Sequence, residues 1–256
     1  MTGAARNGTP HMTLCPERLK AVVFDYGNTI IPFGRPEIAR LDAALTRGLA
    51  RHYPTPDEAR VAAIRDRNRM APYAGDPPAY RENDLRDITM AMVRELYGRD
   101  PSEAELDHLL RVRHEAFLDV IDTPGYARGV LERLAARRPL ALLSNYPNGA
   151  AIREGLERGG LADLFACVVV SGDLGYCKPH PITFTTVLDQ LGVAPSEAVY
   201  VGDNWLADVQ GAKRAGMAMI HTTQFAPAEP FAPQPGDLEP DAVIGHLREI
   251  AALLDS

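Results

Sequence analysis

Lysine is scarce in this chain. Among its 27 basic residues only Lys20, Lys178 and Lys213 are lysines, and arginine supplies the rest of the positive charge. Acidic residues outnumber basic ones, and the net charge of -7 gives no reason to expect nucleic acid or an anionic membrane as a partner. A site for a phosphate group must therefore be positive locally, and a lysine near such a site is conspicuous.

Cysteine is also rare, and long apolar runs are missing. Cys15, Cys167 and Cys177 form no CxxC pair, and an odd number of cysteines cannot form a closed disulfide set. This pattern suits a reducing cytoplasm. No run within residues 1–19 is long enough for a signal peptide, and no later stretch could span a membrane. We therefore expect a cytoplasmic protein whose residues 1–19 form a flexible N-terminal tail.

Short apolar strands alternate with helices over much of the chain. The first strand, Ala21 to Phe24, ends abruptly at Asp25, as a buried parallel strand does. Further strands are predicted over residues 140–143, 167–170, 198–201, 217–220 and 242–244. Helices are predicted over residues 125–137, 149–158, 181–191 and 206–215, and a last helix follows a proline-rich loop over residues 226–240 and the final strand. This alternation predicts an α/β fold with a doubly wound parallel sheet.

The stretch between the first strand and residue 120 has a different character, with helical periodicity and almost no strand signal. Helices are predicted over residues 36–53, from Thr55, over residues 80–97, and from Asp100 to about residue 120, with a loop over residues 71–78. Thr55 and Asp100 each precede a proline and then an acidic residue, which is a typical helix start. We expect residues 20–35 and 120–256 to form an α/β core and residues 36–119 a helical cap.

Polar residues stand where several of the predicted strands end. Asp25, Ser144 and Asp203 each follow an apolar strand, Lys178 lies several residues after another, and Asp208 follows Asp203 by five positions. The carboxyl ends of parallel strands meet at one edge of the sheet, where ligands bind. We therefore expect a carboxylate nucleophile, a hydroxyl, an ammonium and two further carboxylates to meet there.

These groups suit phosphoryl transfer. A carboxylate such as Asp25 can attack phosphorus and form a covalent intermediate. Mg²⁺ held by Asp203 and Asp208 would neutralise the charge of the phosphate. Ser144 and Lys178 can donate to the remaining phosphoryl oxygens. Asn145 is a weaker candidate for contacting the substrate or the carboxylate of Asp25.

The order and content of these segments resemble the haloacid dehalogenase (HAD) superfamily, whose members are mostly Mg²⁺-dependent phosphatases. The family pattern is Asp-x-Asp-x-Thr, then Ser or Thr, then Lys-Pro, then Gly-Asp-x4-Asp, and it maps onto Asp25 and Thr29, Ser144, Lys178 and Pro179, and Asp203 with Asp208. The resemblance covers residues 20–36 and 120–250, and it implies a C1-type helical cap over the intervening residues. It also implies that Asp25, the backbone carbonyl of Gly27, Asp203 and Asp208 hold the metal. Thr29 is expected to donate to Asp25, to cap the turn after the strand, or to do both.

Gly27 departs from the family pattern, which has a second Asp there as general acid. One hypothesis is a phosphatase whose leaving group needs little protonation, or whose acid comes from elsewhere. Another is a 2-haloacid dehalogenase, a branch that also lacks the second Asp but usually lacks carboxylates like Asp203 and Asp208. A third is a catalytically weak binding protein. A phosphonoacetaldehyde hydrolase is effectively excluded, because residues 36–119 contain no lysine for a Schiff base.

The function expected from the sequence is therefore a Mg²⁺-dependent phosphohydrolase of the HAD type. Its substrate would be a small phosphorylated metabolite, and Asp25 would carry the phosphoryl group as an aspartyl-phosphate. The loop over residues 71–78 of the cap, which contains three prolines, could close over the site and choose the substrate. The sequence leaves open the substrate, the replacement for the missing acid and the oligomeric state.

Overall fold

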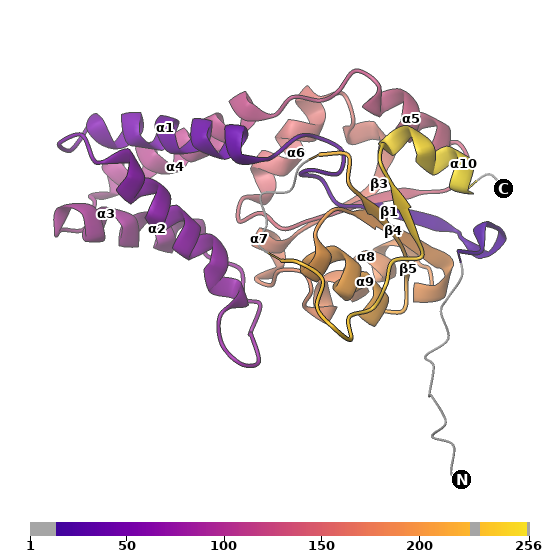
Figure 1. The fold of residues 1–256 in the computed structure, drawn as a ribbon. Helices are drawn as coiled ribbons and strands as arrows, with labels where there is room; N and C mark the ends of the chain where they lie inside the picture. Colours follow the sequence, from indigo (N-terminus) through magenta and orange to yellow (C-terminus); the bar gives the residue numbers. More distant parts are fainter. Residues whose placement is uncertain (1–13, 226–230, 255–256) are drawn as a thin grey trace, which may run out of the picture.

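A six-stranded parallel sheet forms the centre of the computed structural model, which describes residues 14–225 and 231–254 (Figure 1). The strand order is β3-β2-β1-β4-β5-β6, so the chain fills one side of β1 first and then the other. The strands are β1 (Ala21–Phe24), β2 (Leu140–Ser144), β3 (Phe165–Val170), β4 (Ala198–Gly202), β5 (Ala218–Thr222) and β6 (Ala242–Ile244). The predicted α/β fold with a doubly wound parallel sheet is confirmed.

Helices cover both faces of the sheet. Val22 and Phe24 of β1 pack in one apolar cluster, whereas Val23 between them packs in the other, because successive side chains of a strand point to opposite faces. The first cluster joins the sheet to α5 (Ala127–Ala135), α6 (Gly149–Arg158) and α10 (Ile250–Leu254). The second joins it to α8 (Pro181–Leu191) and α9 (Gly211–Arg214). A short helix, α7 (Ser171–Leu174), follows β3 and has no counterpart in the sequence-based prediction.

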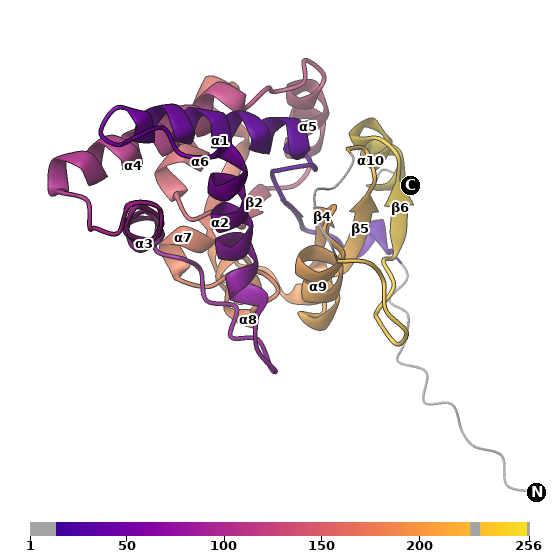
Figure 2. The ribbon, with the colours of Figure 1, turned by 60° about the vertical axis from the view of Figure 1, so that its left-hand side comes forward.

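Four helices form a separate body between β1 and α5. They are α1 (Arg35–Ala50), α2 (Glu58–Met70), α3 (Leu85–Tyr97) and α4 (Glu103–Val120). They enclose an apolar cluster of their own that includes Leu45, Val61, Met92 and Leu109. Figure 2 shows these indigo to magenta helices beside the sheet rather than in its layers. We call them the helical insertion; the exact division of the chain into core and cap stays a prediction.

Three helices of the insertion begin later than the sequence pattern predicted. The N-cap of α2 is Asp57, which accepts a hydrogen bond from Ala59 N–H, and not Thr55. The N-cap of α4 is Ser102, which forms a capping box with Glu105. In both cases the proline lies before the helix, because a side chain that can cap follows it. α3 begins after Asp84 and not at residue 80, since the Asp84 carboxylate accepts from two backbone N–H groups of the first turn.

Other segments match the prediction more loosely. Residues 205–210 form a π-helical turn before α9, where an ordinary helix was expected. Pro16–Arg18, within the predicted tail, form one 3₁₀ turn, while residues 1–13 of that tail and 226–230 of the proline-rich loop lie outside the described residues. Among the helices that the structure describes, none is both long and apolar enough to cross a membrane.

Candidate active site

The ammonium group of Lys178 lies at the centre of the polar cluster. Its Nζ is 2.7 Å from Asp25 Oδ1, 2.7 Å from Asp208 Oδ1 and 2.7 Å from the hydroxyl oxygen of Tyr200. The Lys178 side chain is 2% exposed, so water does not screen these contacts. An ammonium group has three N–H donors, and each of these three oxygens can accept one. The lysine is thereby fixed between two carboxylates from different parts of the chain.

Three carboxylates converge around this lysine. Oxygens of Asp25, Asp203 and Asp208 lie within 4.8 Å of one another, and all three residues are buried. They follow β1 and β4, the neighbouring strands on either side of the point where the strand order reverses. Asp25 and Asp208 carry two negative charges when both are ionised, and the one ammonium group that they share balances only one of them. A hard cation that prefers oxygen ligands, such as Mg²⁺, therefore fits this donor set.

Burial and charge shift the proton affinities of the cluster. Desolvation raises the pKa of Asp25 to about 6, and the nearby charge of Asp208 adds to this, although Lys178 pulls in the opposite direction. Burial alone would lower the pKa of Lys178, but Asp208 and Asp25 outweigh it and raise that pKa to about 12. At neutral pH the cluster thus contains an ionised nucleophile candidate beside a protonated lysine.

Close backbone packing positions Asp208. A Cβ atom on Gly202 would lie 2.5 Å from the Asp208 carboxylate, so only glycine leaves room for that side chain to fold back over the end of β4. The N–H of Asn204 donates to Asp208 Oδ2 at 2.9 Å, while Oδ1 accepts from Lys178. Asp203 is held through its backbone, since a ring nitrogen of His221 lies 2.9 Å from its carbonyl oxygen.

Asn145 holds the backbone of Lys178. Its Oδ1 accepts from Lys178 N–H at 2.8 Å, and its Nδ2 donates to the Lys178 carbonyl at 3.0 Å and to the Tyr73 hydroxyl at 3.1 Å. We call residues 175–180, between α7 and α8, the lysine loop. The structure places Asn145 beside this loop, where it connects the end of β2 to the helical insertion. Contact between Asn145 and a substrate stays a prediction.

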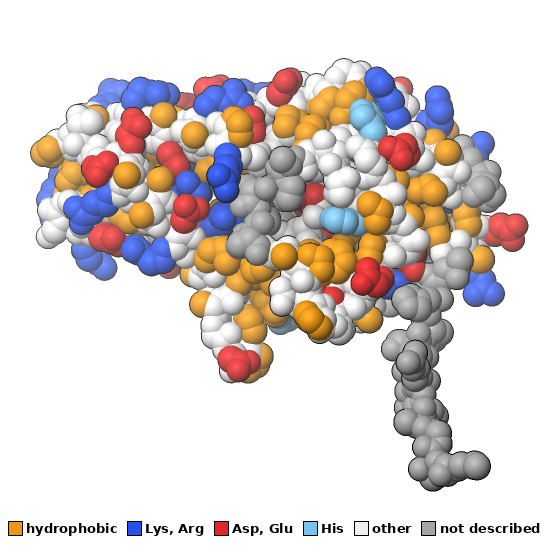
Figure 3. Space-filling model, viewed as in Figure 1, with side chains coloured by type: hydrophobic (Ala, Val, Ile, Leu, Met, Phe, Trp, Pro, Cys, Tyr) orange, Lys and Arg blue, Asp and Glu red, His pale blue; other side chains and the backbone are white. Residues whose placement is uncertain are grey.

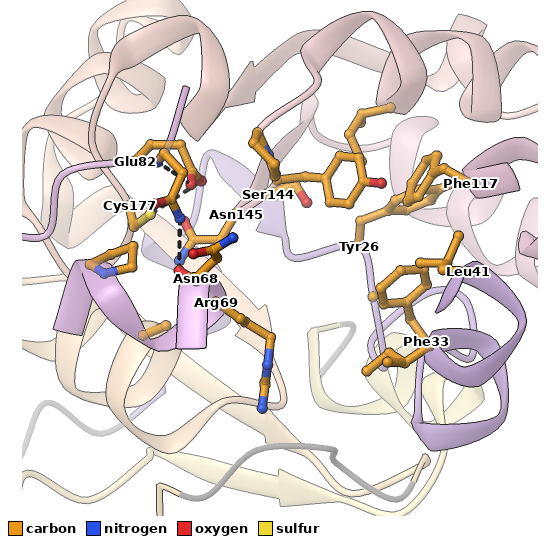
Figure 4. Close-up of a pocket in the computed structure, with 18 of the residues that line it drawn as sticks. Tyr26, Phe33, Leu41, Asn68, Arg69, Glu82, Phe117, Ser144, Asn145 and Cys177 are labelled. Atoms are coloured by element: carbon orange, nitrogen blue, oxygen red, sulfur yellow. Dashed lines mark hydrogen bonds between the residues drawn. The ribbon is translucent and has the colours of Figure 1, made fainter. Parts of the chain in front are cut away.

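A cavity of about 290 Å³ lies between the sheet edge and the helical insertion. Asp25, Gly27, Ser144, Lys178 and the two later carboxylates line one side of it. Phe33, Leu41 and Phe117 form an apolar wall, and Figure 4 shows them opposite Glu82, Cys177 and Asn145. The side chain of Arg69 reaches into the space between the two groups (Figure 4).

Thr29 and Gly27 occupy the turn after β1. Thr29 is fully buried, and among the described residues its hydroxyl has no hydrogen-bond partner, so its predicted hydrogen bond to Asp25 is not present here. A Cβ atom on Gly27 would lie 3.2 Å from Phe33 Cβ. The space that a second aspartate would need is therefore bounded by an aromatic ring of the cavity wall.

Backbone hydrogen bonds join the helical insertion to the lysine loop. The N–H of Cys177 donates to the Tyr80 carbonyl at 2.7 Å, and the N–H of Glu82 donates to the Gly175 carbonyl at 3.1 Å. Glu82 Oε2 also accepts from the hydroxyl of Ser171 at 2.5 Å. The same oxygen accepts from the thiol of Cys177 at 3.2 Å, and Figure 4 shows these two side chains together. We call residues 80–82 and 175–177 the bridge segment.

The structure adds one residue to the cluster that sequence reasoning missed. The hydroxyl of Tyr200 accepts from Lys178 and donates to Asp208 Oδ1 at 3.1 Å or to the Leu143 carbonyl at 3.1 Å. Burial raises its pKa well above the ordinary value, so it stays a neutral phenol. The signal was a tyrosine within an otherwise aliphatic strand, since a buried phenol needs a polar partner.

Comparison with known proteins identifies the family. A family model described as haloacid dehalogenase-like hydrolase matches residues 19–216 of this chain. The chain belongs to this family of hydrolases.

Several known proteins are similar to it. A phosphoserine phosphatase of Thermus thermophilus is 40% identical over 118 residues, which is 45% of each chain. A ribulose-1,5-bisphosphate 5-phosphatase of Halopiger xanaduensis is 29% identical over 211 residues, 82% of this chain and 85% of that protein. For the first two curated relatives the match spans about 45% of their length.

Solved structures share the fold. A 2-haloacid dehalogenase from Pseudomonas syringae pv. Tomato aligns with a TM-score of 0.67 and 25% identity over 93% of this chain and 98% of that chain. The magnesium-bound YfnB protein of Bacillus subtilis aligns with a TM-score of 0.68 and 19% identity over 93% of this chain and 100% of that chain. The arrangement of sheet and helical insertion is therefore common to enzymes of different names.

Proposed function

We propose that the chain is a Mg²⁺-dependent phosphohydrolase that acts on a small phosphorylated metabolite through an aspartyl-phosphate on Asp25. The observation that carries this proposal is the buried cluster of Asp25, Asp203 and Asp208 around Lys178. The relatives named as phosphatases support it. Free cysteines at all three positions support a reducing compartment, the cytoplasm, as its location.

Asp25, Asp203 and Asp208 would hold the metal, together with the backbone carbonyl of Gly27. Bound Mg²⁺ would polarise a phosphoryl oxygen and offset the repulsion between the substrate and the carboxylates. Asp208 has one oxygen on Lys178 and the other on the N–H of Asn204, so it would act directly or through a water.

The chemical step is a pair of displacements at phosphorus. A carboxylate oxygen of Asp25 forms a bond to phosphorus while the bond to the leaving oxygen breaks, and that oxygen keeps the electron pair. Water then attacks phosphorus and the Asp25 oxygen leaves, which restores the carboxylate and releases phosphate. Lys178 and Ser144 would stabilise the charge on the phosphoryl oxygens and on Asp25. Thr29 would contribute only after its hydroxyl, unpaired among the described residues, turns to Asp25, a hydrogen bond that this structure does not have.

Gly27 defines which substrates this arrangement would favour. The position offers no carboxyl group to protonate the leaving oxygen. Leaving groups that are stable as anions, such as those of anomeric or acyl phosphates, would need no such acid. A bias toward these substrates is the specific expectation of the proposal.

A 2-haloacid dehalogenase is the second candidate. The favouring observations are the missing second aspartate at Gly27 and the shared fold with a 2-haloacid dehalogenase at 25% identity. The buried carboxylates at 203 and 208 favour the phosphatase instead, because a dehalogenation by Asp25 has no use for a divalent cation.

Phosphate release tests the proposal. The panel contains p-nitrophenyl phosphate, acetyl phosphate, sugar 1-phosphates and sugar 6-phosphates, each with Mg²⁺ and with EDTA. Release that requires Mg²⁺ and disappears in Asp25→Asn is the expected result, strongest with the activated esters. Silence across the panel from folded protein, with chloride release from 2-chloropropionate, would replace the phosphatase with a dehalogenase.

A further inference from the structure

A half-buried arginine in the helical insertion has no acidic hydrogen-bond partner among the described residues. Arg113 lies on α4, and its neighbours along the same helix face, Leu109, Ala116 and Phe117, belong to the buried apolar residues. Its Nη2 is 3.7 Å from the sulfur of Met92, a weak acceptor. Its Nε is buried and has no hydrogen-bond partner among the described residues. A guanidinium that is taken out of water without a partner costs stability, so its presence needs a reason.

The acid whose charge acts on Arg113, Asp42, does not supply that reason. Asp42 lines the same cavity, but its carboxylate accepts from Arg65 at both oxygens, at 3.0 and 2.7 Å. Arg65 is thus the bidentate partner of Asp42. Burial lowers the pKa of Arg113, although Asp42 and Tyr146 act against this. The residue nevertheless stays charged at neutral pH, because arginine does not lose its proton in proteins.

Arginines elsewhere on the insertion are treated differently. Arg67, Arg86 and Arg99 lie at the surface and form ion pairs with Glu95, Glu103 and Glu105, respectively. Figure 3 shows the same pattern on the visible face of the insertion, where basic and acidic side chains alternate. Arg113 is half-buried beside a cavity instead, with its Nε unpaired within the described part of the chain and its Nη2 on the sulfur of Met92.

We propose that Arg113 binds a carboxylate on the part of the substrate that is not phosphorylated. This inference rests on the proposed function, since Asp25 and Lys178 receive the phosphoryl group and Arg113 lines the same cavity. One guanidinium matches one carboxylate in charge and in its two parallel donors. A second phosphate group would bring two negative charges, which a single arginine does not balance.

The cavity wall also restricts the rest of the substrate. Phe33, Leu41, Phe117 and Ile88 line the cavity together with the carboxylate cluster and Arg113. The ring of Phe117 stacks on that of Tyr146 with 4.2 Å between the ring centroids, and its centroid is 5.6 Å from that of Phe33. This wall is therefore largely aromatic. The cavity volume of about 290 Å³ is at the lower limit for small-molecule sites. The substrate class is therefore a small phosphate monoester with an apolar or aromatic spacer and one carboxylate.

Matched substrates isolate the carboxylate. 4-Carboxyphenyl phosphate and 4-carbamoylphenyl phosphate have the same shape, and only the first carries a second charge. Wild-type protein with Mg²⁺ is expected to have a kcat/KM for the carboxylate at least about tenfold higher than for the amide, since hydrogen bonds to charged groups are worth that much. In Arg113→Met this ratio should fall close to one, with the rate for the amide within about twofold of wild type.

Two further variants control the comparison. Arg111→Met removes an exposed arginine from the same helix and should keep the wild-type ratio, which excludes an effect of net charge. Arg113→Lys keeps the charge without the planar pair of donors and should give an intermediate ratio. A purely structural arginine would behave differently: Arg113→Met would then melt lower and lose both substrates equally. We expect its melting temperature to equal or exceed that of wild type, because a half-buried charge without an acidic partner in the described chain is removed.

A binding measurement tests the carboxylate site independently of phosphatase activity. 4-Phosphonobenzoate and its carboxamide cannot be hydrolysed, and calorimetric titration with Mg²⁺ measures their Kd. If no ester is hydrolysed but the carboxylate binds at least about tenfold better than the amide, and only when Arg113 is present, the phosphatase proposal fails and the carboxylate site stands. A wild-type ratio near one, or a ratio that survives in Arg113→Met, would overturn the carboxylate site.

Discussion

The side-chain amide of Asn145 binds both backbone groups of Lys178: its oxygen accepts from the Lys178 N–H, and its nitrogen donates to the Lys178 carbonyl. The lysine side chain leaves this anchored residue to reach Asp25 and Asp208. The position of the ammonium group therefore depends on a side chain from the end of another strand. Rotation of the Lys178 backbone would move the ammonium away from both carboxylates.

The first prediction concerns this anchor. Asn145→Ala should lower kcat about 10- to 100-fold with little change in KM, because a small displacement of a catalytic group costs that much. Steady-state kinetics with p-nitrophenyl phosphate measures it. Asn83→Ala is the control, since Asn83 lines the same cavity but donates to the Asn68 carbonyl instead. A rise in KM alone would show that Asn145 contacts the substrate and does not position the lysine.

The second prediction concerns the raised pKa of Asp25. Burial raises this pKa from 3.8 to about 6, so the fold disfavours the ionised carboxylate above that pH and bears no such cost below 3.8. Without metal, Asp25→Asn should raise the free energy of unfolding at pH 7.5 by about 1–3 kcal/mol, although it abolishes activity.

The gain in stability should shrink between pH 6 and pH 4 and vanish below. Urea unfolding in EDTA over this pH range measures it, with Asp122→Asn as an exposed control. A gain that is equal at pH 4 and pH 7.5 would show that the Asp25 charge is not its source.

The third prediction concerns the space beside Gly27. A Cβ atom here meets Phe33 Cβ at 3.2 Å, so Gly27→Asp requires the ring to move by a few tenths of an ångström. Gly27→Asp combined with Phe33→Ala should accept the aspartate more readily, and Mg²⁺ binding should persist in both. The new acid should raise the rate for phenyl phosphate, which has a poor leaving group, at least about tenfold more than the rate for p-nitrophenyl phosphate.

Phe33→Ala alone is the control for that comparison. Equal changes for good and poor leaving groups would contradict the role of Gly27 in leaving-group choice.

The fourth prediction concerns Cys177, which lies beside the lysine. Burial raises the pKa of its thiol far above the ordinary range, and the neighbouring Glu82 raises it further. The thiol is therefore protonated at pH 8 and should resist iodoacetamide, whereas the exposed Cys15 should react. Mass spectrometry of native and guanidinium-unfolded protein distinguishes the two sites. Fast alkylation of Cys177 with loss of activity would instead indicate a reactive thiol in the site.

The sequence predicted the sheet and the convergence of its polar ends. Apolar runs that stop at Asp25, Ser144 and Asp203 indicated parallel strands, and parallel strands bring their carboxyl ends together whatever their separation along the chain. Lys178 was predicted in the same place because it follows β3. These inferences depend on periodicity and topology, which local sequence determines well.

The sequence pattern could not predict features that depend on contacts between side chains from distant parts of the chain. Tyr200 stands in an apolar strand, and only the fold shows that its hydroxyl meets Lys178. Arg113 has an ordinary place on an amphipathic helix, and its missing partner is visible only once Asp42 and Arg65 are seen together. The sequence predicted two helix starts too early, at Thr55 and Asp100, whereas the observed N-caps are Asp57 and Ser102. Several residues before each helix can cap it, and neighbouring contacts decide which one does.

The bridge segment couples movement of the helical insertion to movement of the lysine loop. Two backbone hydrogen bonds join residues 80–82 of the insertion to residues 175–177, immediately before Lys178. The insertion cannot swing away from the sheet unless these bonds break or the lysine loop moves with it. Opening of the cavity by an outward movement of the insertion would therefore also move the loop that carries Lys178, and with it the ammonium group that contacts Asp25 and Asp208.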